Sequence, residues 1–255
     1  MITFNTLGRH GQLGNQMFQY ALLQGISSKR GVEVAFTPEI IKSSYLFNIF
    51  KLSNYSINLT EIKKEYREPK FDFNNEVFNL DNISYFGYFQ SEKYFNHCKE
   101  LISREFTFND HIVSNVNSIL APYKDKKLVS VHIRRGDYLI NPDYHPLPNI
   151  EYYNTAMDLL DGEDTHFICV SNDPDWCKSN IVRPNLTYHY NNLDIDMCLI
   201  SNCHHHIIAN SSFSWWGSWL SPFENKKVYA PPIWFGPRAS DLNVKDLYRD
   251  EFIVL

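Results

Sequence analysis

Short apolar runs alternate with segments of helical periodicity through the second half of the chain. The apolar runs cover residues 128–133, 167–170, 186–190, 206–209 and 228–230. Between them, two segments place apolar residues on one helix face: Ile150, Tyr153, Met157 and Leu160 in the first, and Ile195, Cys198, Leu199 and Cys203 in the second. Continuously apolar strands joined by helices are typical of a parallel sheet covered on both faces. The pattern therefore predicts a doubly wound α/β domain.

The first half of the chain predicts a strand, a glycine-containing loop, a helix and a second strand. Residues 2–7 and 32–36 are the predicted strands. The helix follows from small and apolar residues at helical spacing, namely Phe18, Ala21, Leu22, Gly25 and Ile26. Residues 38–89 are aromatic and rich in Asn with weak periodicity, and we predict one strand there, over residues 83–89.

Charge and hydropathy exclude several classes of protein. Lys and Arg total 24 against 29 Asp and Glu, and no run of like charges stands out, which argues against a nucleic-acid-binding surface. The first residues lack the pattern of a signal peptide, and no apolar stretch approaches the ~20 residues of a membrane-spanning helix. We expect a cytoplasmic protein, with peripheral association at the inner membrane face left open. The five cysteines contain no C-x-x-C pair and are predicted to be buried free thiols.

In a doubly wound sheet, ligands bind beyond the carboxyl ends of the strands, so the polar residues there are candidate site residues. The segment His132-Ile133-Arg134-Arg135-Gly136-Asp137-Tyr138 ends the 128–133 run. Two arginines at a strand end favour a bound diphosphate, because each charge-assisted hydrogen bond contributes roughly 1.5–3 kcal/mol. The alternative is a surface Arg–Asp ion pair, worth about 0–1 kcal/mol.

Two further segments could bind an anion at a helix N-terminus. The first is Gly11-Gln12-Leu13-Gly14-Asn15-Gln16, for which a simple glycine turn is an equal alternative. Its glycine spacing, with Glu33 inside the next strand, disfavours a nicotinamide fingerprint. The second is Asn210-Ser211-Ser212-Phe213, where the serines cap a predicted helix over 213–220 and could also hold a phosphate.

Three other polar features have structural as well as functional interpretations. Asp196 favours a helix N-terminus, and its carboxylate could instead accept the N–H donors of a guanine. The segment Ser171-Asn172-Asp173-Pro174 is explained adequately as a turn with a helix cap. His204, His205 and His206 follow one another on a predicted strand, where neighbouring side chains point to opposite faces, so they are not expected to bind zinc together.

Taken together, these segments resemble the α-1,2-fucosyltransferases of glycosyltransferase family eleven. The matching stretches are GQLGNQMFQYA from Gly11, HIRRGDY from His132, SNDPDWCK from Ser171, and Asp196 to Leu220, which ends NSSFSWWGSWL. Gln12 departs from the family, in which a glycine is common at this position. The resemblance implies a GT-B-like α/β fold of two Rossmann-like lobes, with residues 1–120 on the acceptor side and residues 121–255 binding GDP-fucose.

The resemblance also implies a role for each matched residue. Arg134 would bind the β-phosphate and stabilise the leaving GDP, while Arg135 would hold the loop and Asp137 would orient an arginine or approach the acceptor. His132 and Asp196 would frame the guanine. Ser211, Ser212 and Phe213 would hold the diphosphate, and Gly14 with Asn15 would contact the diphosphate or the fucose.

The implied reaction is the inverting transfer of L-fucose from GDP-fucose to a hydroxyl of a galactose-terminated glycan in α-1,2 linkage, with no metal and no cofactor beyond the donor substrate. Its setting would be the biosynthesis of lipopolysaccharide or oligosaccharide, or protein glycosylation. Two alternatives stay open: another GDP-sugar or linkage on the same fold, and a nucleotide- or glycan-binding module without catalysis.

Overall fold

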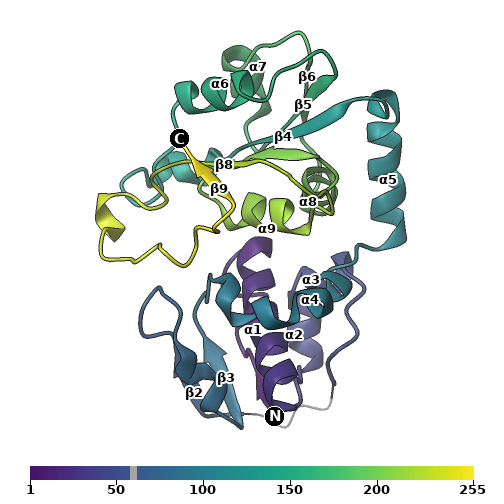
Figure 1. Ribbon diagram of the computed structural model, residues 1–255. Coiled ribbons are helices and arrows are strands. Elements are labelled where there is room, and N and C mark those ends of the chain that lie inside the picture. Colours follow the sequence, from purple (N-terminus) through teal and green to yellow (C-terminus); the bar gives the residue numbers. More distant parts are fainter. Residues whose placement is uncertain (58–61) are drawn as a thin grey trace. The chain divides into compact units, whose positions relative to one another are not determined.

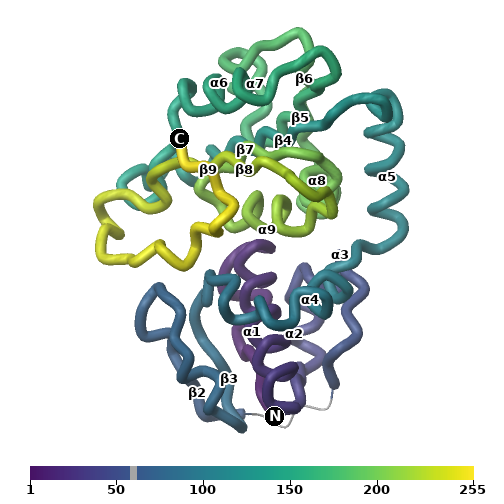
Figure 2. The backbone as a smooth tube through the Cα atoms, viewed as in Figure 1, coloured from purple at the N-terminus to yellow at the C-terminus, as the bar shows by residue number. Residues whose placement is uncertain are grey.

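The computed structural model describes residues 1–57 and 62–255 (Figure 1). These residues divide into two compact units. The N-terminal unit is Met1–Asn109 with Leu242–Arg249, and the C-terminal unit is Asp110–Asp241 with Asp250–Leu255. Residues 242–249 thus return to the N-terminal unit, and the chain then ends in a strand of the C-terminal unit, as the trace in Figure 2 shows.

The N-terminal unit contains a three-stranded parallel sheet in the order β1-β3-β2. Its strands are β1 (Ile2–Thr3), β2 (Glu65–Arg67) and β3 (Ile83–Phe86). The predicted strand over 2–7 ends at Thr3, because turns begin there and the Leu7 N–H donates to the Phe4 carbonyl. The predicted strand over 32–36 is reduced to single bridges, Val34 with Ile2 and Ala35 with Ser56.

The predicted first helix is confirmed as α1 (Leu13–Arg30). It ends at Gly31, whose left-handed backbone (φ +67°) suits glycine and whose N–H donates to the Ser27 carbonyl. Gly25 lies where a Cβ would come within 2.1 Å of the Tyr94 carbonyl oxygen, so this crossing requires glycine. The shorter helices are α2 (Pro38–Ser43), α3 (Leu46–Ile49), α4 (Lys99–Glu105) and the 3-10 turns η1 (Asn75–Asn79), η2 (Glu92–Tyr94) and η3 (Asn96–Cys98).

The C-terminal unit is built on a six-stranded parallel sheet in the order β6-β5-β4-β7-β8-β9. The strands are β4 (Lys127–Ile133), β5 (Thr165–Ser171), β6 (Leu186–His189), β7 (His205–Ile207), β8 (Val228–Ala230) and β9 (Phe252–Val254). The first five were predicted. Counted from β4, the order is 3-2-1-4-5-6, the arrangement of a dinucleotide-binding fold, and it reverses between β4 and β7.

Helices cover both faces of this sheet (Figure 1). They are α5 (Asp110–Leu120), α6 (Ile150–Asp158), α7 (Pro174–Asn180), α8 (Leu193–Ser201) and α9 (Ser212–Leu220), with 3-10 turns η4 (Ala121–Tyr123), η5 (Gly136–Ile140) and η6 (Pro237–Ala239). Helices α6 and α7 close an apolar core with Val129, Val131 and Phe167. The lobe boundary expected at residue 120 falls at the end of α5, which packs against α8 within the C-terminal unit.

Candidate functional site

The candidate site lies where the strand order of the C-terminal sheet reverses. Strands β4 and β7 pair in parallel, with Val131 opposite Ile207, so their carboxyl ends lie at one edge. The loops that follow carry Arg134 to Asp137 and Asn210 to Phe213. Polar groups from two motifs that are far apart in the sequence thus lie at the position where doubly wound sheets bind ligands.

Arg134 pairs with Asp137 in this structure, Nη2 to Oδ1 2.6 Å. The Arg134 side chain is 26% exposed and that of Asp137 is 60% exposed. The guanidinium also lies 5.4 Å from the centre of the Tyr138 ring. The contact with Asp137 uses one nitrogen of the guanidinium, so other N–H donors of Arg134 can bind a diphosphate while Asp137 stays in place.

Arg135 points into a different set of contacts. Its Nε is 2.9 Å from Asp173 Oδ2, and its guanidinium lies 4.0 Å from the centre of the Trp176 ring. Its backbone N–H donates to Asn172 Oδ1 at 2.9 Å. Gly136 has φ +45°, and a Cβ there would come within 2.3 Å of Asn172 Nδ2. These contacts fix the backbone of the loop that carries Arg134.

The segment after β5 therefore does more than form a turn. Asp173 is the N-cap of α7, as expected, and accepts from the Trp176 N–H at 3.3 Å. Its other carboxylate oxygen holds Arg135, and Asn172 holds the Arg135 backbone. Asn172 and Asp173 could be recognised in the sequence, but their contact with Arg135 could not.

We expect Asn172→Ala to lower turnover about tenfold, the scale of one lost hydrogen bond to a loop that positions a charge. Steady-state kinetics with purified protein would measure it, and Asn172→Asp, which keeps the acceptor oxygen, should recover part of the loss. Asp175→Ala, on the exposed first turn of α7, is the matched control. Equal rates for Asn172→Ala and that control would remove Asn172 from the positioning of the loop.

His132 is the last buried polar side chain of β4. Its side chain is buried, and its ring centre lies 5.5 Å from that of Phe213. Burial, with a smaller contribution from Arg134, lowers the pKa of His132 to about 3, so the imidazole is neutral at pH 7. Its Nδ1 is buried without a hydrogen-bond partner among residues 1–57 and 62–255. A ligand with a neutral donor or acceptor would satisfy it.

The β7 loop is tied to the β4 loop through Tyr138. The Tyr138 hydroxyl donates to the Asn210 carbonyl at 3.1 Å, and burial raises its pKa to about 12. Asn210 Nδ2 in turn donates to the carbonyls of Pro146 and Trp234, both at 2.9 Å. Ser211 caps α9, its Oγ accepting from the Phe213 N–H at 3.3 Å. The N-terminus of α9 is consequently held at the same edge as Arg134.

Asp196 is buried in the first turn of α8, the helix that packs against α9. Its Oδ1 accepts from Asn191 Nδ2 at 2.9 Å, and its Oδ2 accepts from the Asn191 N–H at 3.3 Å. Burial raises the pKa of Asp196 to about 6, although the hydrogen bonds from Asn191 act in the opposite direction. No Lys or Arg of the described chain pairs with this carboxylate, which leaves it able to bind a ligand with N–H donors.

Gly14 and Asn15 belong to the N-terminal unit, whereas the other candidates belong to the C-terminal unit. Gly14 is buried inside the first turn of α1, whereas Gly8 and Gly11 have φ +86° and +90° and form the turn before it. Asn15 Oδ1 accepts from Gln90 Nε2 at 2.7 Å. The glycine-turn interpretation thus holds for the loop itself, and Asn15 lies at the start of the helix.

The three consecutive histidines have separate partners. His204 Nδ1 accepts from the Leu128 N–H and His205 Nδ1 from the Lys227 N–H, both at 3.0 Å, while His206 Nδ1 lies 2.9 Å from Ser130 Oγ. Within the described residues, no group of three or more His, Cys, Asp or Glu side chains could hold a metal ion.

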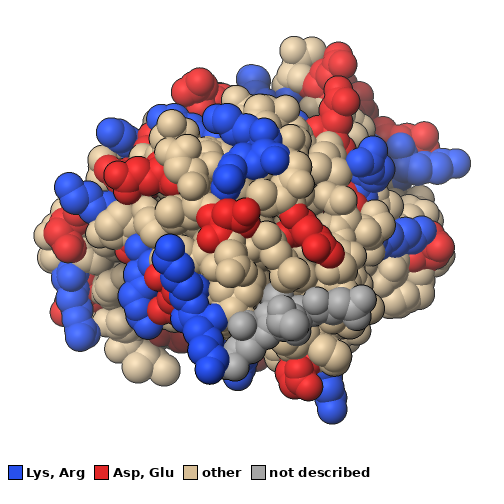
Figure 3. Space-filling view, turned by 90° about the horizontal axis from the view of Figure 1, so that it is seen from below, with Lys and Arg blue, Asp and Glu red and all other residues tan. Residues whose placement is uncertain are grey.

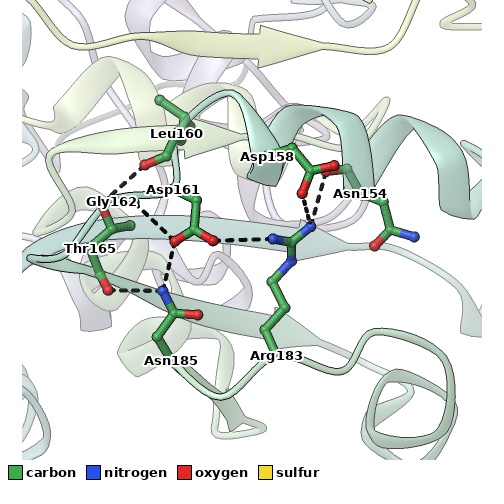
Figure 4. Close-up of polar contacts among 8 residues, drawn as sticks. All are labelled: Asn154, Asp158, Leu160, Asp161, Gly162, Thr165, Arg183 and Asn185. Atoms are coloured by element: carbon green, nitrogen blue, oxygen red, sulfur yellow. Dashed lines mark hydrogen bonds and ion pairs between the residues drawn. The ribbon is translucent and has the colours of Figure 1, made fainter.

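A hollow of about 290 Å³ borders the opposite edge of the sheet, at the amino ends of β4, β5 and β7. Its lining includes Lys127, His205, Lys227 and Asp161. Figure 4 shows that Asp161 is already engaged by Arg183, by Asn185 and by the Gly162 N–H. This carboxylate anchors the connection from α6 to β5.

Surface charge and helix hydropathy bear on binding to membranes or polyanions. On the face in Figure 3, basic and acidic side chains of the described residues are interspersed rather than gathered by sign. Among the helices of the described residues, none is both long and apolar enough to cross a membrane.

Two solved structures illustrate the similarity of the fold. The fucosyltransferase NodZ from Bradyrhizobium matches with a TM-score of 0.58 at 11% identity, covering 87% of this chain and 93% of that one. POFUT1 in complex with GDP matches with a TM-score of 0.57 at 9% identity, covering 90% and 97%. The predicted GT-B-like α/β fold is confirmed.

The sequence model described as Glycosyl transferase family 11 matches residues 1–254. An alpha-1,2-colitosyltransferase of Escherichia coli is 31% identical over 95% of this chain and 96% of its own. Galactoside alpha-(1,2)-fucosyltransferase 2 of Rattus norvegicus is 27% identical over 87% of this chain and 67% of its own. The chain belongs to glycosyltransferase family 11, as its motifs predicted.

Proposed function

We propose that this chain transfers L-fucose from GDP-fucose to a hydroxyl of a galactose-terminated glycan, in α-1,2 linkage and with inversion. The observation that carries the proposal is the pair of loops at the switch point of the C-terminal sheet, which present Arg134 and the N-terminus of α9 at one edge. Support for the donor comes from fucosyltransferases of similar fold, one of them co-crystallised with GDP. Support for the linkage comes from galactoside alpha-(1,2)-fucosyltransferases among the relatives.

In this proposal the C-terminal unit holds the nucleotide. Arg134 and the Ser211-Ser212-Phe213 turn bind the diphosphate, because guanidinium and helix N–H groups both favour anions. The neutral His132 and the carboxylate of Asp196 frame the guanine. The carboxylate accepts hydrogen bonds from the N–H groups of the guanine edge. Gly14 and Asn15 contact the diphosphate or the fucose.

The chemistry requires one bond to break as another forms. The acceptor hydroxyl oxygen attacks the anomeric carbon of fucose and gives up its proton to water, the bond from that carbon to the β-phosphate oxygen breaks, and GDP leaves with the electron pair. Arg134 stabilises the charge that develops on the diphosphate, and no metal is needed for that role. The 2.6 Å contact with Arg134 supports Asp137 as the group that orients this guanidinium. Arg135 holds the loop.

A GDP-release assay with a panel of galactose-terminated acceptors, followed by linkage analysis of the product, tests this function. We expect GDP release from GDP-fucose to be stimulated by acceptor and to be unchanged within about twofold by EDTA, because Arg134 takes the role that a metal would otherwise have. Strong inhibition by EDTA would contradict the metal-free mechanism. A β-linked or differently positioned fucose would contradict the assigned linkage.

A second candidate is transfer of a different sugar from its GDP derivative, favoured by the 31% identity to an alpha-1,2-colitosyltransferase. Comparing turnover of GDP-fucose, GDP-colitose and GDP-mannose with one acceptor separates the two. Slow GDP release that no acceptor stimulates would instead indicate a binding module without catalysis.

A further inference from the structure

A stack of aromatic rings lies at the carboxyl edge of the N-terminal sheet. Strands β1 and β3 pair in parallel, so the loops that follow them leave from the same edge. His10, from the first loop, stacks on Phe86 with ring centres 4.7 Å apart and on Tyr88 with ring centres 4.6 Å apart. The interplanar angles are 29° and 18°. The two loops therefore present one joint surface where a parallel sheet binds its ligands.

A buried glutamine joins the two loops. Gln19, on α1 and fully buried, donates from Nε2 to the His10 carbonyl and to the Gly87 carbonyl, both at 3.0 Å. Its Oε1 is buried and has no hydrogen-bond partner in the described part of the chain. The position of His10 relative to Tyr88 is thus fixed by the hydrogen bonds of Gln19 as well as by the contact between the rings.

The turn after β3 is held in an unusual conformation. Gly87 has φ +149° and Phe89 has φ +51°, a region that side chains other than glycine rarely adopt. The half-buried carboxylate of Glu68 stabilises the turn by accepting the N–H groups of Tyr88 at 2.7 Å and Phe89 at 3.0 Å. Strained backbone that is fixed by surrounding groups is typical of ligand-binding segments. Here it directs the side chains of Tyr88 and Gln90.

The side chains so placed remain partly exposed and chemically suited to a sugar. His10, Asn15, Tyr88 and Gln90 are each neither buried nor fully exposed. An aromatic ring packs on the apolar face of a pyranose, and amide groups both donate to and accept from its hydroxyls. Gln90 Nε2 donates to Asn15 Oδ1 at 2.7 Å, so this surface is continuous with the residue proposed to contact the donor.

We propose that His10, Tyr88 and Gln90 form the surface that binds the terminal pyranose of the acceptor. The inference rests on the proposed function, because it takes Asn15 as the contact to the diphosphate or fucose and places the acceptor sugar beside it. The Tyr88 ring, supported by its stacking on His10, takes the apolar face of the sugar, and Gln90 selects its hydroxyls.

Kinetics of Tyr88→Leu and Gln90→Ala with lactose as acceptor test the proposal. We expect the KM for lactose to rise about tenfold, the scale of losing one stacking or hydrogen-bonding partner, while the KM for GDP-fucose changes less than about twofold. Tyr45→Leu, which removes another exposed tyrosine of the same unit, is the matched control and should leave both constants unchanged. The assignment would be overturned if Tyr88→Leu and Gln90→Ala raised the KM for lactose and the KM for GDP-fucose equally. It would also be overturned if neither variant changed the KM for lactose.

A binding measurement keeps the test independent of turnover. The imidazole signals of His10 would be followed by NMR during titration of the wild-type protein with methyl β-galactoside, methyl β-glucoside and methyl α-mannoside. We expect saturable shifts with the galactoside that Tyr88→Leu abolishes, even if GDP-fucose proves to be the wrong donor. Absence of a shift with all three sugars would reject the surface as a sugar site, whatever the outcome of the transferase assay.

Discussion

Arg134→Ala is expected to lower the turnover of GDP-fucose by about 10²–10³ while the fold stays intact, the scale for removing one group that stabilises developing charge. The leaving diphosphate gains charge as the bond to fucose breaks, and the guanidinium at the end of β4 acts on that charge in a partly enclosed position. The fold should survive because the interaction lost is a pair with the mostly exposed Asp137, worth about 0–1 kcal/mol. Single-turnover kinetics and thermal unfolding measure the two effects separately.

The matched control for this variant is Arg183→Ala. Arg183 also belongs to the C-terminal unit and pairs with the carboxylates of Asp158 and Asp161, but at the opposite edge of the sheet (Figure 4). Its loss should leave turnover unchanged. Arg134→Lys should retain part of the rate, since it keeps the charge but not the two-pronged hydrogen bonding. Near-normal turnover of Arg134→Ala would remove this residue from the mechanism.

The C-terminal sheet was predictable because each of its central strands is a continuous apolar run. Leu128 to Ile133 are all buried between layers of helix, and this burial is what the sequence pattern encodes. Strand β9 was missed because Ile253 and Val254 lie on an exposed edge strand, where no such pattern is required. Helix α5 was missed although Ile112 and Val116, its buried residues, have a helical spacing that a search of that segment could have found.

The N-terminal unit was harder to predict, because its structure depends on contacts between distant residues. Strand β2 has three residues, all partly or fully exposed, and it exists through pairing with β3 rather than through its own pattern. The carboxylate of Glu105 collects hydrogen bonds from Tyr20, Ser53 and Asn54, residues up to 85 positions away. Local propensity carries no signal for partners of this kind.

The motifs identified candidate groups for the site but not how those groups are held. Arg134 and Arg135 are neighbours with the same chemistry, yet one faces Asp137 and the other is clamped by Asp173 and Trp176. The hydrogen bond from Tyr138 to Asn210 and the stacking of His10 on Tyr88 join loops that only the sheet topology brings together.

Asp196→Asn is expected to weaken binding of GDP-fucose about 10²-fold, the scale of charge-assisted hydrogen bonds to the guanine edge, and at the same time to stabilise the protein. Binding needs the carboxylate form, so in the wild type the KM for GDP-fucose should rise as the pH falls through about 6, where burial has moved the Asp196 pKa. The asparagine variant should lose this dependence.

The gain in stability follows from the same shift. Burial raises the folded-state pKa of Asp196 from its usual value of 3.8 to about 6, so the folded protein binds this proton more tightly than the unfolded chain does. The buried charge therefore destabilises the folded state most above pH 6, and the penalty disappears as the pH falls toward 4. Chemical denaturation at pH 8 should show Asp196→Asn more stable than the wild type by about 1–3 kcal/mol, with the difference vanishing near pH 4. If Asp196→Asn were as stable as the wild type and still selective for GDP-fucose, Asp196 would be an ordinary residue of the α8 N-terminus. Only a buried carboxylate that is left without a cation in order to bind a ligand both destabilises the fold and supports binding.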